Sequence, residues 1–166
     1  MKGHETFLQA AARLVQTRQD LLFVCVGGRQ QKDADRLKAL AASLGLENRV
    51  IWAGSREDMS AVYSALDIVS SSSFVGEGFA NVIAEAMACE RPCVVTDVGD
   101  SARIVGNIGE VVPPRNPDAL AEAMARMLDR MKRTPDIGRQ ARARIVAEFS
   151  VERMVLQILE VIDGQY

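Results

Sequence analysis

Two glutamates inside a largely apolar stretch are the first candidates for chemistry. Glu77 and Glu85 stand in FVGEGFANVIAEAMACERP (residues 74–92), and Gly76 and Gly78 flank the first of them. Glycine lets the backbone approach a ligand closely, and the N-terminus of a following helix presents unpaired N–H groups to an anion. A carboxylate can accept two hydrogen bonds, as a vicinal diol requires. The spacing therefore suits a ligand with phosphate in the middle and hydroxyl groups at both ends.

A plainer interpretation is that these glutamates only solvate a helix, as most lone carboxylates do. Against it, Val82, Ile83 and Ala86 make the helix largely apolar, so a buried Glu85 would need a partner. Asn81 lies four residues before Glu85 and shares its face of the helix. Spacing alone leaves both interpretations open.

The elements that must position this loop alternate between short apolar strands and helices. We expect strands at residues 21–26, 49–54, 67–72, 92–96 and 110–114. We expect helices at residues 3–17, 33–44, 55–66, 79–89, 101–105, 117–131, 135–148 and 151–162. This alternation predicts one α/β domain over residues 1–166, with a parallel sheet flanked by helices on both faces. Ligands of such sheets bind beyond the carboxyl ends of the strands.

Four polar residues are expected to begin helices. Ser55, with Asp58 three residues on, resembles a capping box. Asn116 precedes a proline at the first helical position, and Thr134 repeats that arrangement. Ser150 is expected to cap the last helix, whose apolar stripe fits either contact with another domain or ordinary core packing.

Composition narrows the class of protein. The net charge of -2 gives no basic footprint for nucleic acid. No apolar run approaches the ~20 residues of a membrane span, and the N-terminus lacks the apolar block of a signal peptide. The three cysteines form no disulfide framework and no metal-ligand set, so we expect a reducing cytoplasm and no metal.

The wider sequence resembles a known family. SSSFVGEGFANVIAEAMACERPCVVTDVGD, followed by GEVVPPRNPDALAEAM, is similar to the C-terminal domain of retaining glycosyltransferases of family 4, which have the GT-B fold. KGHETFLQAAARL, LLFVCVGG and LENRVIWAG resemble further family segments, so the resemblance covers nearly all of residues 1–155. It implies a Rossmann-like domain that binds a nucleotide-sugar donor and transfers the sugar with retention, without a metal or other cofactor.

The resemblance also implies roles for individual residues. Glu85 would bind the ribose hydroxyls of the nucleotide, and Glu77 would lie near the donor sugar as the catalytic candidate. Lys2 would neutralise the diphosphate, with Gly27 and Gly28 lining the same cleft. Further candidate donor-binding residues are those of the helix start and of the segment that meets the base: Gly78, Phe79, Ala80, Asn81, Gly54 and Ser55.

Several features depart from the family pattern. Ala80 replaces the usual glycine, Arg103 stands where a glutamate is common, and Glu90 stands where a helix-ending glycine is common. A left-handed backbone at Glu90 would cost about 1–2 kcal/mol. The family's strand before the lysine helix, which bears an arginine, and its N-terminal acceptor domain both lie outside this chain. We therefore expect five strands, with the first strand of the domain missing and a gap or a partner chain in its place.

Two hypotheses follow. In the first, the chain is the donor-binding part of a glycosyltransferase; it binds a nucleoside diphosphate weakly and transfers no sugar alone. The missing N-terminal domain would be its main partner, the full enzyme could sit peripherally on a membrane, and oligomers could form through the gap in the sheet. In the second, the chain is a non-catalytic α/β module for nucleotide binding or assembly. His4, beside Lys2, could lie near the donor phosphate, and Arg56 could stack on or pair with a nucleotide, but the simpler expectation for both is the surface.

Overall fold

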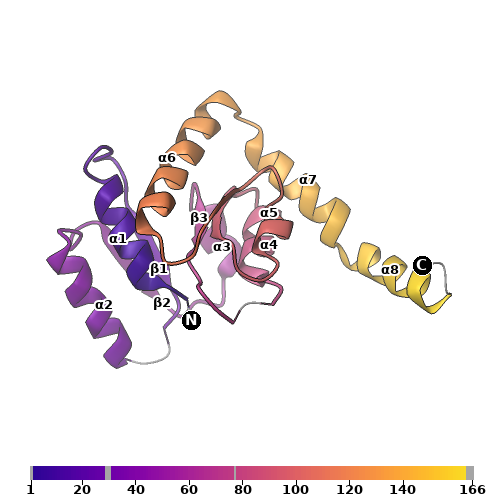
Figure 1. Ribbon diagram of the computed structural model, residues 1–166, viewed down its shortest axis with the longest axis horizontal. Coiled ribbons are helices and arrows are strands. Elements are labelled where there is room, and N and C mark those ends of the chain that lie inside the picture. The colour runs from indigo at the N-terminus through magenta and orange to yellow at the C-terminus, as the bar shows by residue number, and fades with distance from the viewer. Residues whose placement is uncertain (1, 29–30, 77, 164–166) are drawn as a thin grey trace.

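The computed structural model describes residues 2–28, 31–76 and 78–163. Strands and helices alternate along the chain as expected (Figure 1). The strands are β1 (Phe23–Val26), β2 (Val50–Gly54), β3 (Val69–Ser71), β4 (Cys93–Thr96) and β5 (Glu110–Val112). The helices are α1 (His4–Leu14), α2 (Gln31–Ser43), α3 (Met59–Ser64), α4 (Asn81–Ala88), α5 (Ser101–Val105), α6 (Pro117–Arg133), α7 (Ile137–Phe149) and α8 (Val151–Ile162).

All strand pairs are parallel, and they form two separate sheets. β1 pairs with β2, and β4 lies between β3 and β5. Among the described residues, no strand pairing joins β1 to β3. Over the residues that the structure describes, the expectation of five strands with a gap in the sheet is therefore confirmed.

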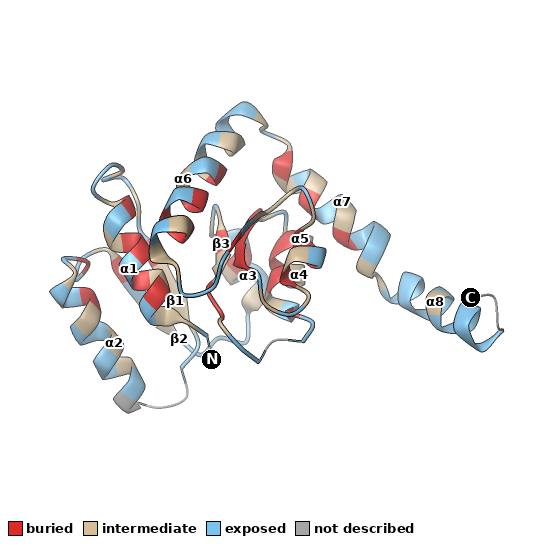
Figure 2. Ribbon diagram, in the orientation of Figure 1, coloured by how far each residue is buried: buried red, intermediate tan, exposed pale blue. Residues whose placement is uncertain are grey.

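Helices cover both faces of the three-stranded sheet, and the side chains of β4 show why. Val94 belongs to a buried cluster with α1, α6 and β1, whereas Cys93 and Val95 belong to a second cluster with α4, α5 and α7. Successive side chains of a strand point to opposite faces, and all three are fully buried. A strand that is apolar on both faces requires helices on both, so the layered α/β architecture follows from this short run (Figure 2).

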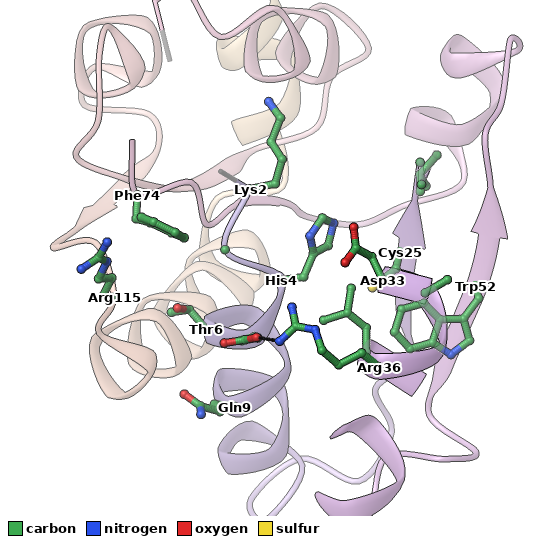
Figure 3. Close-up of a pocket in the computed structure, with 17 residues that line it drawn as sticks. Lys2, His4, Thr6, Gln9, Cys25, Asp33, Arg36, Trp52, Phe74 and Arg115 are labelled. Carbon is green, nitrogen blue, oxygen red and sulfur yellow. Dashed lines mark hydrogen bonds and ion pairs between the residues drawn. The ribbon is translucent and has the colours of Figure 1, made fainter. Parts of the chain in front are cut away.

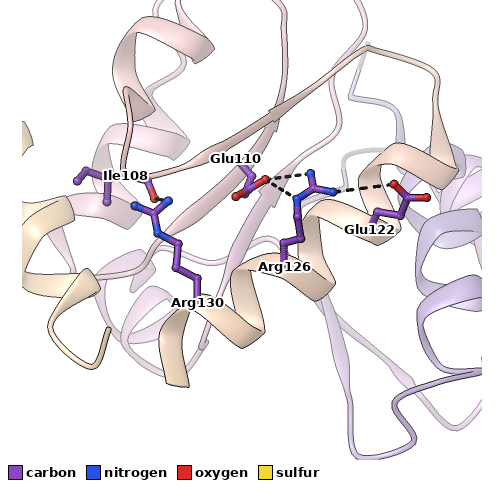
Figure 4. A network of polar contacts seen from close by, with 5 residues as sticks. All are labelled: Ile108, Glu110, Glu122, Arg126 and Arg130. Atoms are coloured by element: carbon purple, nitrogen blue, oxygen red, sulfur yellow. Dashed lines mark hydrogen bonds and ion pairs between the residues drawn. The ribbon is translucent and has the colours of Figure 1, made fainter. Parts of the chain in front are cut away.

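A polar network fastens α6 to the strand at the edge of the sheet (Figure 4). The Arg126 guanidinium donates from Nε to Glu110 Oε2 on β5 at 3.0 Å, and its Nη2 lies 2.9 Å from the same oxygen. One turn on, Arg130 donates to the Ile108 carbonyl oxygen at 3.2 Å. Such partly exposed pairs add little stability individually. They fix the register of α6 against β5 and so the position of the loop between them.

The last helix, α8, has no buried residue and leads away from the body of the domain (Figures 1 and 2). Its apolar residues are all exposed, from Val155 at 44% to Ile162 at 72%. Core packing of this stripe, one of the two expected interpretations, is therefore wrong within the chain. Contact with another domain stays a prediction.

Two expected helix starts are also corrected. Ser55 does not begin α3; Asp58 is the N-cap, and its carboxylate is held by Arg56 at 2.6 and 2.8 Å instead of bonding the helix. Likewise α7 begins after Asp136, two residues beyond the expected start at Thr134. The caps at Asn116 and Ser150 are confirmed, because each side chain accepts a backbone N–H three residues on. Glu90 adopts the expected left-handed backbone, with a φ of 62°.

Candidate functional site

The glycine loop after β3 leads into α4 as expected, and a tyrosine on α3 holds Glu85. The Tyr63 hydroxyl donates to Glu85 Oε2 at 2.9 Å. Tyr63 is buried, whereas Glu85 is exposed. Burial, and then the hydrogen bond to Glu85, raise the pKa of Tyr63 above its ordinary value, so the phenol stays protonated and donates. The Tyr63 hydroxyl thus orients the Glu85 carboxylate, and Glu85 remains exposed to solvent.

The turn into α4 is open on its outer side. An added Cβ at Gly78 would meet no atom within 4 Å, and Phe79 is 43% exposed. Within the described chain, the backbone N–H groups of Phe79 and Ala80 have no recorded acceptor, whereas that of Asn81 donates to the Phe79 carbonyl oxygen at 3.1 Å. Two N–H groups at a helix start can therefore donate hydrogen bonds to an anionic ligand. The Phe79 ring packs on Phe149 with centroids 5.6 Å apart, which anchors the turn.

The N-terminus is fastened next to the end of β3. Ser72, which is buried, donates from its hydroxyl to the carbonyl oxygens of Lys2 and Gly3, 3.0 Å from each. Gly3 has a φ of 63°, and an added Cβ there would lie 1.9 Å from the Ser72 carbonyl oxygen. A glycine is therefore required at this contact. It fixes the backbone that carries Lys2 at the carboxyl edge of the sheet.

A cavity of about 690 Å³ opens beside this N-terminus (Figure 3). Trp52 and Cys25 lie on one side of it, and Phe74 and Arg115 lie on the other, with His4 between them. The lining residues come from both parts of the divided sheet with their following loops, from the first half of α1 and from α2. They include Lys2, His4, Gly27, Gly28, Phe74 and Arg115.

Burial shifts the pKa of two titratable groups that line the cavity, His4 and Cys25. His4, expected at the surface, is half-buried, and burial followed by the charge of Lys2 lowers its pKa. Burial raises the pKa of the Cys25 thiol to about 11. Both groups are consequently uncharged at neutral pH. The charged side chains that line the cavity are therefore those of its lysine, arginines and acidic residues.

The structure brings together only part of the expected site. The cavity is lined by Lys2, Gly27 and Gly28. Gly54 lies next to Gly27, because its carbonyl oxygen accepts the Gly27 N–H at 2.7 Å. Ser55 is exposed beyond Gly54. Glu85 and the residues of the helix start, Gly78, Phe79, Ala80 and Asn81, lie at the α4 turn and do not line this cavity. Glu77 lies outside the described residues.

Two residues of the site were not found by sequence reasoning. Tyr63 is the partner that Glu85 needs, and Arg115 joins the cavity from the loop after β5. The only signal for Tyr63 was an aromatic residue in a short helix before β3. The position of that helix against α4 follows from the tertiary fold and not from spacing.

Comparison with known proteins now supplies the family. The family model described as "Glycosyl transferases group 1" matches residues 1–130. The chain belongs to the group 1 glycosyl transferases. It is 32% identical over 177 residues to a D-inositol 3-phosphate glycosyltransferase of Salinispora tropica, covering 97% of this chain and 35% of that protein. It is 35% identical over 133 residues to an alpha-D-kanosaminyltransferase of Streptomyces kanamyceticus, covering 77% of this chain and 33% of the relative.

Solved glycosyltransferase structures share the fold of this group 1 chain. The Anabaena protein HepE, solved in complex with UDP, superposes with a TM-score of 0.86 at 28% identity, over 98% of this chain and 45% of HepE. The C-terminal domain of a group 1 glycosyl transferase (LpcC) from Francisella tularensis gives 0.77 at 22% identity, over 90% of this chain and 80% of that domain. The chain is thus one half of a GT-B fold, and it spans about a third of the length of the curated relatives it matches.

A bilayer-spanning helix is not found in this group 1 chain, since none in the described ranges is both long and apolar enough.

Proposed function

We propose that this chain is the donor-binding domain of a retaining, family 4 glycosyltransferase that moves a sugar from a nucleoside-diphosphate sugar to an acceptor. The observation that supports it most is the orientation of Glu85 by the buried Tyr63, beside a helix start where two N–H groups have no acceptor among the described residues. A structural carboxylate would not need a buried donor and an exposed position at once. The bond from Tyr63 occupies one carboxylate oxygen and leaves the remaining lone pairs of Glu85 available to a ligand diol.

In this proposal each element has one task. Glu85 accepts hydrogen bonds from the ribose, and the N–H groups of Phe79 and Ala80 bind the diphosphate. Lys2 adds positive charge at the same edge of the sheet, and the backbone of Gly54 and Ser55 meets the base. Glu77 acts near the donor sugar. The cation and the helix N-terminus stabilise charge on the departing diphosphate, which takes the place of a metal ion.

The partner is the N-terminal acceptor domain of the same enzyme, in the cytoplasm. Two observations support this part of the proposal: the divided sheet and the exposed apolar face of α8. The chain alone would bind the nucleotide and transfer no sugar, because the acceptor binds elsewhere.

Titration calorimetry tests the proposal with UDP, GDP and ADP at concentrations up to the millimolar range. We expect one of the three to bind to the wild-type chain and to lose about tenfold in affinity in Glu85→Ala, the loss of a charge-assisted contact. Glu47→Ala is the matched control. This exposed glutamate precedes β2 and so lies at the amino ends of the strands, away from the proposed site. Binding of none of the three nucleotides would contradict the proposal.

A second candidate is a non-catalytic module that retains the fold. It is favoured by one observation: Glu85 and the α4 turn do not line the large cavity. Under this alternative a ligand would occupy the cavity without touching Glu85. Unchanged nucleotide affinity in Glu85→Ala would select it.

A further inference from the structure

Arg115 has a backbone conformation that arginine rarely adopts. Its φ is 58°, and among the described residues Glu90 is the one other non-glycine with a positive φ. Left-handed backbone is costly for a residue with a Cβ and costs glycine little. Glu90 ends α4, where its N–H donates to the Met87 carbonyl oxygen at 3.0 Å. Arg115 follows Pro114 in the turn between β5 and α6, where a positive φ would favour glycine, so an arginine at this position points to a role for its side chain.

The side chain of Arg115 is held against an aromatic ring at the cavity. Its guanidinium carbon lies 4.4 Å from the centroid of the Phe74 ring. Phe74 follows β3 and Arg115 follows β5, so the contact bridges the carboxyl end of β4, which lies between them. Figure 3 shows the pair on the side of the cavity away from Trp52. Stacking fixes the plane of the guanidinium and leaves its N–H edge available.

No acceptor for those N–H groups is recorded in the described part of the chain. Other arginines of the domain are paired: Arg36 with Glu5 in the same cavity, Arg18 with Asp129, and Arg126 with Glu110. Arg115 is exposed, so its contact with Phe74 is too weak to offset the backbone cost in full. A planar fork of donors, held in position without an acceptor, is suited to an oxyanion that binds through two oxygens.

We propose that Arg115, stacked on Phe74, binds a phosphate group of the ligand that enters the cavity. This inference rests on the proposed function, because it adds a phosphate-binding residue to the same edge of the sheet as Lys2. The phosphate belongs either to the diphosphate of the nucleotide or to a separate phosphorylated compound. In both cases Arg115 contacts the anion directly, and Phe74 orients Arg115.

Arg115→Gly provides an unusually clean test, because glycine relieves the backbone strain while it removes the charge. We expect the melting temperature of this variant to equal or exceed that of the wild type. Titration calorimetry with UDP, pyrophosphate and uridine then measures binding. We expect the affinity for pyrophosphate to fall about tenfold, as for the loss of one charge-assisted contact, and uridine binding to be unchanged. Arg139→Ala removes the same charge from an exposed site on α7 and should leave all three affinities unchanged.

The outcomes separate the possibilities. Weaker binding of both UDP and pyrophosphate assigns Arg115 to the nucleotide diphosphate, whereas weaker binding of pyrophosphate alone assigns it to a separate phosphate. Wild-type affinity of Arg115→Gly for both ligands overturns the inference and leaves the proposed function standing. If the wild-type chain binds neither UDP nor pyrophosphate, the proposed function and the inference fail together.

Discussion

Replacement of Gly3 by alanine tests how the N-terminus is held at the site. The new Cβ would lie 1.9 Å from the Ser72 carbonyl oxygen, and the backbone φ is 63°. If residues 2 and 3 stay in place, the left-handed backbone costs about 1–2 kcal/mol and the overlap about 1–3 kcal/mol more.

A second route relieves that strain. If the terminus moves away from Ser72, the domain loses the serine hydroxyl contact and the first helical bond, from the Phe7 N–H to the Gly3 carbonyl oxygen at 3.1 Å. Each is worth about 1 kcal/mol. The cheaper route prevails, so we expect a loss of about 2 kcal/mol and displacement of Lys2.

Gly45→Ala is the matched control. Gly45 has a φ of 73°, and an added Cβ would meet no atom within 4 Å, so the backbone strain is the same without the overlap. Thermal unfolding followed by circular dichroism should show the larger loss for Gly3→Ala. Hydrogen exchange should show a faster Phe7 amide in that variant alone, and calorimetry should show weaker UDP binding. Equal behaviour of the two variants in all three measurements would refute the reasoning.

Two further predictions concern the site. Tyr63→Phe removes the donor to Glu85, so UDP affinity measured by calorimetry should fall about fivefold, a loss of ~1 kcal/mol. Ser64→Ala on the same helix should not change it, and an equal effect of both changes would contradict the role of the hydroxyl. Because burial raises the pKa of Cys25 to about 11, its alkylation, followed by mass spectrometry, should be slow at pH 7.5 and should accelerate up to about pH 11. A rate that levels off near pH 8.5 would show a normal thiol.

Local signals predicted much of the fold. The alternation of short apolar runs with helices predicted a parallel sheet between helices, and the burial of CVVT (residues 93–96) on both faces agrees with it. The caps at Asn116 and Ser150 were predictable because each bond spans three residues of sequence. The gap in the sheet came from the resemblance and not from periodicity.

Contacts between distant segments account for what the sequence did not reveal. The failed capping box at Ser55 is the exception, because it is local: Arg56, two residues away, holds the Asp58 carboxylate at 2.6 and 2.8 Å. Tyr63 on α3 donates to Glu85 on α4, and the two residues are 22 positions apart in the sequence. The pairing of Arg115 with Phe74 depends on the order of the strands, which places the loops after β3 and β5 around the end of β4.

A nuclear magnetic resonance titration of the 166-residue chain with UDP tests the central claim most directly. If a nucleoside diphosphate binds between the α4 turn and the glycine turn after β1, the amide signals of Phe79, Ala80, Gly27 and Gly28 should shift together, with one dissociation constant. Shifts confined to other parts of the domain, or no shifts at millimolar UDP, would contradict it.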